Sequence, residues 1–437
     1  LSESGRDEVT LVEAGPDYPA LAESPDDLRD ARKNAKSHDW GYRFKPSATQ
    51  RIWSFPRGRV VGGSSAVNTC IALRGHPYDF DEWAALGLDD WSFERCLPAF
   101  KRLEHDLDFD NEWHGQDGPV PIRRHPPSEL VPWQAAFVAA AQAAGYPETV
   151  DHNDPELPCG VGPHAMNKVG GERVGVARAY LTADVRRREN LKILSGRVAR
   201  RLVFDNRRFC GLEVDLDGVV SLLRADRAVV ACGAIGTPGL LLRSGIGPER
   251  DVARLAVNLV CDSPTVGARL LDHPGTAIIF LPKRGVADVR HPLIQTMARC
   301  TSIGSDHPFD LQLQPGSFLA LFGLEVPVVS LMCNVGKPRG HGTIHFTSAD
   351  PSAKPHIEAR FLVDARDRAV LADAVERLWA IGRQRPIADI ASPVFPSRSV
   401  LSRPDRIERF LPQITGSGYH PCGSVPMSAG SIEDGAV

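Results

Sequence analysis

The sequence lacks several features that would assign it to a specialised class of protein. No apolar run reaches the roughly 18 residues needed for a transmembrane helix, so no membrane span is predicted. The 437 residues carry 51 Lys and Arg against 54 Asp and Glu, a formal net charge of −3. This balance gives no basic excess and therefore does not point to nucleic acid as a partner. Without repeats or low-complexity tracts, the composition is that of an ordinary globular protein with room for more than one domain.

Cysteine is sparse and scattered along the chain. There are 9 cysteines, and none forms a C-x-x-C pair or joins histidine at the spacing of a zinc site. The pattern argues against a disulfide framework and against a bound metal, and it favours a reducing compartment, which predicts a cytoplasmic location. No signal peptide is visible, but the chain begins at Leu1 rather than Met. We therefore expect an N-terminal segment to be missing.

Hydrophobic patterns predict both strands and helices. Short apolar or β-branched runs predict strands over 9–12, 191–194, 198–204, 211–216 and 228–231, the last of them buried. Asp217-Gly218 has the chemistry of a hairpin turn after the fourth run. Runs at 278–280, 328–331 and 343–346 predict an antiparallel sheet, and helices are expected over 129–144, 367–381 and 404–411.

The first motif with chemical content is the acidic residue that ends the first strand. Glu13 follows the run 9–12 and precedes Ala14-Gly15. In dinucleotide folds, a carboxylate at such a strand end accepts hydrogen bonds from ribose hydroxyls, about 20 residues after a glycine-rich phosphate loop. That loop would have to precede Leu1. By itself the motif is weak, because acidic residues often end strands.

Two glycine-bearing segments follow. The segment 58–68, GRVVGGSSAVN, combines adjacent glycines with two serines and an asparagine. Such a backbone can approach a planar or phosphate-bearing ligand closely. The segment 233–247, GAIGTPGLLLRSGIG, predicts a glycine-bearing turn and a short helix whose N-terminus could stabilise negative charge.

These two segments resemble the signature patterns of the glucose–methanol–choline (GMC) oxidoreductases, and the chain looks choline dehydrogenase-like. Further landmarks agree in order along the chain, namely Arg74-Gly75, Asp272-His273-Pro274, Pro338-Arg339-Gly340 and His420-Pro421-Cys422-Gly423-Ser424. The resemblance implies a mixed α/β fold in which a Rossmann-like FAD-binding domain is interleaved with a substrate domain built on an antiparallel sheet. We assign residues 1–277 to the FAD-binding region and 278–437 to the substrate domain and C-terminal region.

The resemblance also implies how FAD is bound. It places the adenosine ribose at Glu13 and Ala14, the adenine at the backbone of Val198, the flavin and pyrophosphate at Val60 and Ser64, and the isoalloxazine ring beside Asn68, Thr69, Cys70 and Ile71. Some family members bind FAD covalently through a histidine just before this asparagine. Here that position is Val67, so we expect non-covalent FAD.

His420 is the catalytic residue implied by the resemblance. Alcohol oxidation by a flavin removes a hydroxyl proton and transfers a hydride, and histidine suits the first task because its pKa lies near working pH. Five other His-Pro pairs occur in the chain, so the dipeptide alone carries little information. Its place before Cys-Gly-Ser and behind both glycine-bearing segments singles out His420.

The resemblance leaves alternatives open. A second catalytic residue is expected beyond Val437, so the chain reads as truncated at both ends. The leading prediction is an FAD-dependent dehydrogenase or oxidase of a small alcohol, with oxygen or a quinone as electron acceptor. A hydroxynitrile lyase-like member with structural FAD is one alternative, and an inactive truncated fragment is another. The sequence does not identify the alcohol.

Overall fold

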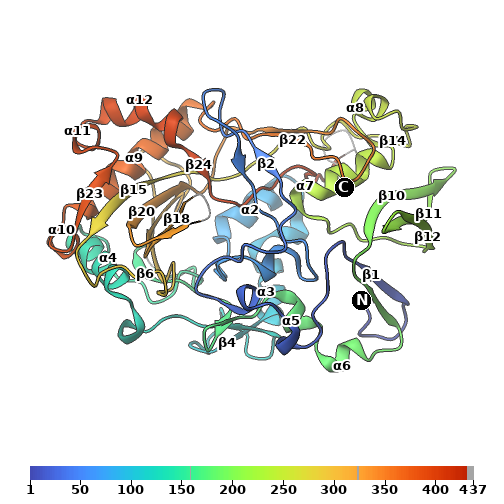
Figure 1. Ribbon diagram of the computed structural model, residues 1–437, viewed down its shortest axis with the longest axis horizontal. Helices are drawn as coiled ribbons and strands as arrows, with labels where there is room; N and C mark the ends of the chain where they lie inside the picture. Colours follow the sequence, from blue (N-terminus) through green and yellow to red (C-terminus); the bar gives the residue numbers. More distant parts are fainter. Residues whose placement is uncertain (158, 322–323, 431–437) are drawn as a thin grey trace.

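The computed structural model of the protein describes residues 1–157, 159–321 and 324–430 (Figure 1). The end of the second predicted domain, 431–437, lies outside these residues. Within the described part, no helix combines the length and the apolar character that crossing a membrane would require. The architecture is mixed α/β, as predicted from the sequence.

A large antiparallel sheet organises one half of the molecule. Its strand order is β23 (Ala391–Phe395), β15 (Pro274–Pro282), β20 (Val329–Val335), β17 (Leu311–Gly316), β16 (Thr296–Cys300) and β6 (Val161–Pro163), and β24 (Gly416–Ser417) also pairs with β15. The prediction of a sheet from the runs at 278–280 and 328–331 is confirmed. The third run was wrongly assigned to it, because β21 (Thr343–His345) pairs with β22 (His356–Glu358). The participation of β6 shows that the two regions are interleaved along the chain.

Helices cover one face of this sheet. α4 (Pro132–Ala143), α9 (Ala365–Gly382) and α12 (Pro404–Ile414) lie at its outer side in Figure 1. Leu371 and Leu378 of α9 are completely buried, and each such side chain contributes about 1.5–3 kcal/mol when removed from water. The indole N–H of Trp133 donates to the Ser330 carbonyl at 3.0 Å, which joins α4 to β20. α4 begins at Pro132 rather than 129 because proline fits the first turn of a helix.

Shorter sheets lie at the opposite end of the molecule, in the half that contains the predicted FAD-binding residues (Figure 1). β1 (Val9–Val12) pairs in parallel with β9 (Leu191–Leu194), in the register Val9↔Leu191. β10 (Val198–Asp205), β11 (Arg208–Leu216) and β12 (Val219–Arg224) form an antiparallel meander. Asp217 and Gly218 have φ values of 51° and 86°, the left-handed geometry that the predicted hairpin turn requires.

One predicted strand is absent. Residues 228–231 do not form a strand, and Val229 is 76% exposed. A strand needs a neighbour to accept and donate its backbone hydrogen bonds. No strand of the described part of the chain lies beside this segment, since β1 belongs to a two-stranded sheet with β9. The helix expected next is confirmed as α7 (Gly233–Arg243).

Candidate flavin and substrate site

The turn after β1 brings two predicted cofactor residues together. The Gly15 N–H donates to Glu13 Oε1 at 2.7 Å, and the Arg197 N–H donates to the Glu13 carbonyl at 2.9 Å. Glu13 and Ala14 therefore lie beside Val198, the first residue of β10. Partial burial raises the pKa of Glu13. A carboxylate has about four lone-pair sites, so Glu13 has capacity left for a ribose hydroxyl beside its hydrogen bonds to the backbone of Gly15 and Ala14.

The segment 58–68 packs directly against this turn. A Cβ added to Gly15 would lie 2.0 Å from the Arg59 carbonyl oxygen, so only glycine permits this approach. The Val61 N–H donates to the Pro16 carbonyl at 3.0 Å, and the Val60 side chain is 2% exposed. The side chain of Val60 is therefore part of a small core cluster, and the residue faces the site through its backbone.

The two adjacent glycines of the segment form a left-handed turn into the short helix η2 (Gly63–Ala66). Gly62 and Gly63 have φ values of 98° and 54°. Ser64 Oγ accepts from the Gly58 N–H at 3.2 Å, which closes the loop. A Cβ on Gly63 would meet no atom within 4 Å, so the backbone there faces open space that a ligand can approach.

The four residues predicted to pass beside the isoalloxazine ring continue from η2. Asn68 Oδ1 accepts from the Cys70 N–H at 3.0 Å, and Ile71 forms a β-bridge with Met166. Thr69 is half-buried between them. Cys70 has φ 64° and a completely buried side chain, and burial raises the pKa of its thiol. The thiol packs with Ala31 and Met166 in a small core cluster, so it cannot act as an exposed nucleophile.

The N-terminus of α7 and the His420 segment are joined. Ser424 is 3% exposed, and its Oγ–H donates to the Ala234 carbonyl at 2.6 Å. The Gly267 N–H donates to the Ser424 carbonyl at 2.8 Å. Gly233 has φ 75°, and a Cβ there would meet nothing within 4 Å. The start of α7 is thus open, and the His420 segment is held close to it.

Asp272 holds the backbone of the His420 loop. Its Oδ1 accepts from the His420 N–H at 2.9 Å and from the His273 N–H at 2.8 Å, and its Oδ2 accepts from the Ser417 hydroxyl. Burial raises the pKa of Asp272. These hydrogen bonds fix the direction in which the histidine side chain leaves the loop.

The His420 ring packs edge-on against His273, with centroids 5.3 Å apart and an interplanar angle of 88°. The ring touches solvent, yet many protein atoms surround it. Desolvation first, then the neighbouring His273 and Arg57, lowers the pKa of His420 to about 4. The imidazole is therefore neutral at pH 7 and able to accept a proton.

Arg57 brings a positive charge to this region. Its guanidinium lies 4.3 Å from the centre of the Phe55 ring, and one of its nitrogens, buried, has no hydrogen-bond partner within the described residues. Burial lowers the pKa of Arg57, partly offset by Asp272 and Tyr419. Asp272 belongs to a landmark visible in the sequence, but neither its role nor that of Arg57 follows from residue spacing.

The residues present fit an FAD molecule. Gly63 and Gly233 expose backbone to open space at two left-handed turns, and Glu13 places a carboxylate next to the backbone of Val198. Backbone N–H groups at a helix start suit a diphosphate, and a carboxylate suits ribose hydroxyls. The structure therefore gathers the predicted cofactor residues around the turn after β1, η2 and the start of α7.

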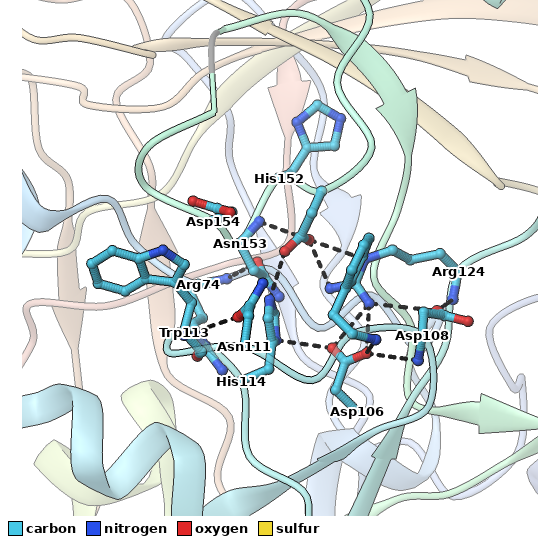
Figure 2. A network of polar contacts seen from close by, with 12 residues as sticks. Arg74, Asp106, Asp108, Asn111, Trp113, His114, Arg124, His152, Asn153 and Asp154 are labelled. Carbon is cyan, nitrogen blue, oxygen red and sulfur yellow. Dashed lines mark hydrogen bonds and ion pairs between the residues drawn. The ribbon is translucent and has the colours of Figure 1, made fainter.

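One group of described residues has the composition of a metal site. Glu104, Asp106 and His114 bring potential ligand atoms within 4.8 Å of one another. These atoms already have partners, as Figure 2 shows for Asp106 and His114. His114 Nδ1 lies 3.1 Å from Glu104 and 3.0 Å from Asp106, and its Nε2 lies 2.7 Å from Asp151. Arg124 lies 2.9 Å from Asp106. The cluster is an ion-pair network, in which arginine and histidine supply the positive charge that a metal would bring.

Comparisons with known proteins identify the class. The chain matches the models of the GMC oxidoreductase family over residues 36–275 and 338–437. It therefore belongs to the GMC oxidoreductase family, and it is a GMC-type, FAD-dependent oxidoreductase acting on small substrates. FAD is the cofactor typical of this family.

Individual relatives are about 30% identical in sequence to this chain. The oxygen-dependent choline dehydrogenase of Rhizobium johnstonii is 31% identical over 470 residues, covering 98% of this chain and 83% of that protein. The pyridoxine 4-oxidase of Microbacterium luteolum is 30% identical over 441 residues, covering 98% and 86%. The crystal structure of pyridoxine 4-oxidase from Mesorbium loti superposes with a TM-score of 0.89 at 28% identity, covering 99% and 86%. The predicted fold is thus confirmed.

Proposed function

We propose that this protein oxidises the CH–OH group of a small alcohol and that His420 accepts the hydroxyl proton. The supporting observation is the state of its imidazole. Asp272 accepts a hydrogen bond from the His420 N–H, and the His273 ring packs against the His420 ring, so the loop is held in place. The ring nitrogens of His420 make no hydrogen bond within the described residues, and the lowered pKa of His420 keeps its ring neutral. A neutral, positioned and solvent-accessible imidazole has the properties of a general base.

Bound FAD would supply the hydride acceptor, at flavin N5. The protein's task is to hold the alcohol with its hydroxyl toward His420 and its carbon toward the ring. We propose that Glu13, Ala14 and the backbone of Val198 hold the adenosine part. Val60, Ser64, Asn68, Thr69, Cys70 and Ile71 would line the flavin part.

Non-covalent attachment of FAD is part of the proposal. Val67 occupies the position before Asn68, and its side chain packs against a small apolar cluster that includes Val60. A valine has no nucleophilic atom that could form a bond to the flavin. Denaturation in trichloroacetic acid should therefore release all FAD into the supernatant.

Several finer assignments stay predictions. The division into 1–277 and 278–437 and the electron acceptor, oxygen or a quinone, belong to this proposal. All 9 cysteines are unpaired in the structure, which agrees with the reducing, cytoplasmic location expected from the sequence.

Substitution of His420 tests the proposal. In the FAD-loaded enzyme, His420→Ala should slow flavin reduction by alcohol about 10²–10⁴-fold, the usual scale for a general base. Anaerobic stopped-flow spectroscopy follows the loss of flavin absorbance. The control is His356→Ala, which replaces an exposed histidine on β22 and should leave the rate unchanged.

Two results would contradict the proposal. Flavin reduction at the original rate in His420→Ala would remove the residue from the mechanism. Cyanohydrin cleavage without any change in the flavin spectrum would instead indicate a lyase, in which the histidine does acid–base chemistry and FAD is structural.

A further inference from the structure

The antiparallel sheet presents two chemically different faces. In β20, Val329, Leu331, Cys333 and Val335 belong to the main hydrophobic core beneath the helices. Successive side chains of a strand alternate between faces, so Ser330, Met332 and Asn334 point to the opposite side. In β17, the core residues Leu311 and Leu313 leave Gln312 and Gln314 on that same side.

Close contacts confirm this assignment of the second face. A Cβ on Gly275 of β15 would lie 1.9 Å from Asn334 Oδ1, and one on Gly316 of β17 would lie 2.5 Å from Ser330 Oγ. Gln312 is paired with Asn334 and Gln314 with Met332 in the β17–β20 register. We call the positions Gln312, Gln314, Met332 and Asn334 the amide face.

The amide face adjoins the His420 loop. A Cβ on Gly418 would lie 2.9 Å from His273 Cβ and 3.4 Å from Asn334 Oδ1. His273 is the residue against which the His420 ring packs. Asn334 therefore lies at the end of the amide face that adjoins the His420 loop, and a molecule that presents its hydroxyl to His420 can extend along this face.

The far side of this face also offers uncharged polar atoms. Gln314 interacts with His164, which is 1% exposed and whose ring nitrogens lack a partner of good hydrogen-bond geometry in the described part of the chain. Burial lowers the pKa of His164 to about 3. A neutral imidazole supplies one donor and one acceptor, so His164 adds hydrogen-bonding capacity without charge.

The charges around the amide face are unsuited to a cation. The side chains on the non-core side of the described strands β15, β16, β17 and β20 are Ala277, Ile279, Leu281, Met297, Arg299, Gln312, Gln314, Ser330, Met332 and Asn334. This set contains no carboxylate, and its charged member is a cation. Near His420, Arg57 adds a second cation and already occupies the face of Phe55. The carboxylate at this loop, Asp272, is buried and accepts hydrogen bonds from the His420 N–H, the His273 N–H and the Ser417 hydroxyl.

We infer that the substrate is an uncharged alcohol that carries further hydrogen-bonding groups, and not a quaternary ammonium alcohol such as choline. This inference rests on the proposed function. Recognition of a quaternary ammonium uses free aromatic faces or carboxylates. The amide face, with His164, instead pairs with neutral donors and acceptors, and a site built to hydrogen-bond a substrate rejects an analogue that lacks the matching group.

Two pairs of matched alcohols test the substrate class with the FAD-loaded enzyme. Choline and 3,3-dimethylbutan-1-ol have the same shape and differ in charge. Pyridin-3-ylmethanol and benzyl alcohol differ by one ring acceptor. We expect kcat/KM for flavin reduction to be lower for choline than for its neutral isostere. It should be about 3- to 10-fold higher for pyridin-3-ylmethanol than for benzyl alcohol, the scale of one neutral hydrogen bond.

Variants of the amide face locate the effect. At least one of Gln314→Leu and Gln312→Leu should bring the pyridine-to-benzyl ratio close to one. Gln413→Leu makes the same chemical change at an exposed position of α12 and should leave the ratio unchanged. Gln314→Glu should raise the choline-to-isostere ratio about tenfold by placing a negative charge on the face. Glutamate has nearly the same size and shape as glutamine. Gln314→Glu therefore still tests the amide face if the leucine variants fail to fold.

The outcomes distinguish the substrate class, the role of the amide face and the proposed function. Faster flavin reduction by choline than by its isostere overturns the substrate class and leaves the proposed function intact. A pyridine-to-benzyl ratio that both leucine variants leave unchanged overturns the role of the amide face. If no alcohol reduces the flavin, the proposed function fails and this inference fails with it.

Discussion

At the scale of single residues, the arrangement around His420 depends on Asp272. The carboxylate accepts two backbone N–H groups and one hydroxyl, although burial raises its pKa. Hydrogen bonds to a charged acceptor are worth more than neutral ones. We therefore expect Asp272 to act as a positioning residue, which holds the loop that carries His420.

Replacement of Asp272 should misplace the base. We expect Asp272→Ala to slow flavin reduction about 10²-fold, because a shift of about 1 Å in a catalytic group has effects of that size. Asp272→Asn keeps an acceptor for the backbone N–H groups and should recover much of the rate. The measurement is anaerobic flavin reduction, with FAD content determined for each variant. Equal rates in Asp272→Ala and the unaltered enzyme would exclude a positioning role.

The residues that carry the site differ in how visible they are in the sequence. Glu13, Gly63 and His420 occur in motifs whose chemistry can be read from residue type and order. Arg57 and the amide face cannot be found this way. Their significance comes from the cross-strand register of β17 and β20 and from contacts between segments distant in the sequence, such as the bond from the His420 N–H to Asp272, which spans 148 positions.

At the scale of elements, the ion-pair network of Figure 2 connects several segments near the predicted flavin loop. Asn153 Oδ1 accepts from the Arg74 N–H at 2.8 Å, and its amide N–H donates to the Ala72 carbonyl at 2.9 Å. Arg74 and Arg124 face the three buried carboxylates Glu104, Asp106 and Asp151. Two guanidiniums leave one negative charge, which a protonated His114 balances.

The network makes the stability of the protein depend on His114 in a pH-dependent way. Burial alone would lower the pKa of His114, but hydrogen bonds to Asp106, Asp151 and Glu104 outweigh it and raise the pKa to about 10. Because the folded pKa is above the unfolded value of about 6.5, the stabilisation is complete below pH 6.5 and is lost as pH rises toward 10.

His114→Gln tests this dependence. It should lower the free energy of unfolding by about 3 kcal/mol at pH 6, the scale for removing one partner of a buried ion pair. The difference from the unaltered protein should narrow between pH 7 and 10. Urea unfolding at several pH values provides the measurement, with the exposed His345→Gln as control. A difference that stays constant with pH would show that His114 is neutral in the folded protein.

The sequence also predicts elements unequally. The strands at 9–12 and 191–194 and the helix at 367–381 appear where their apolar periodicity places them, because each pairs or packs within the described chain. The segment 228–231 has the composition of a buried strand and is exposed coil. The composition of a segment indicates whether it favours burial in a strand. Whether the strand forms also depends on a neighbouring strand, and the local sequence does not show whether that neighbour is present.

At the scale of the whole molecule, the proposed cofactor site lies among segments that are separate in the sequence. The segment at η2 and the start of α7 expose left-handed glycines, and Gly15 of the turn after β1 packs against Arg59. The last described segment is joined to α7 through the Ser424 hydroxyl. A ligand that contacts all of these segments would lower the frequency of their local opening.

Hydrogen–deuterium exchange of the FAD-loaded and FAD-stripped protein tests this coupling. We expect FAD to slow exchange in peptides covering 60–71, 230–240 and 418–424, because these backbones face or adjoin the proposed site. The edge strand β23 of the large antiparallel sheet lies at the far end of the molecule (Figure 1) and provides the internal control. Protection confined to the turn after β1 would mean that the cofactor does not reach the His420 segment. The same protection in every peptide would mean that FAD stabilises the fold globally without contacting these segments in particular.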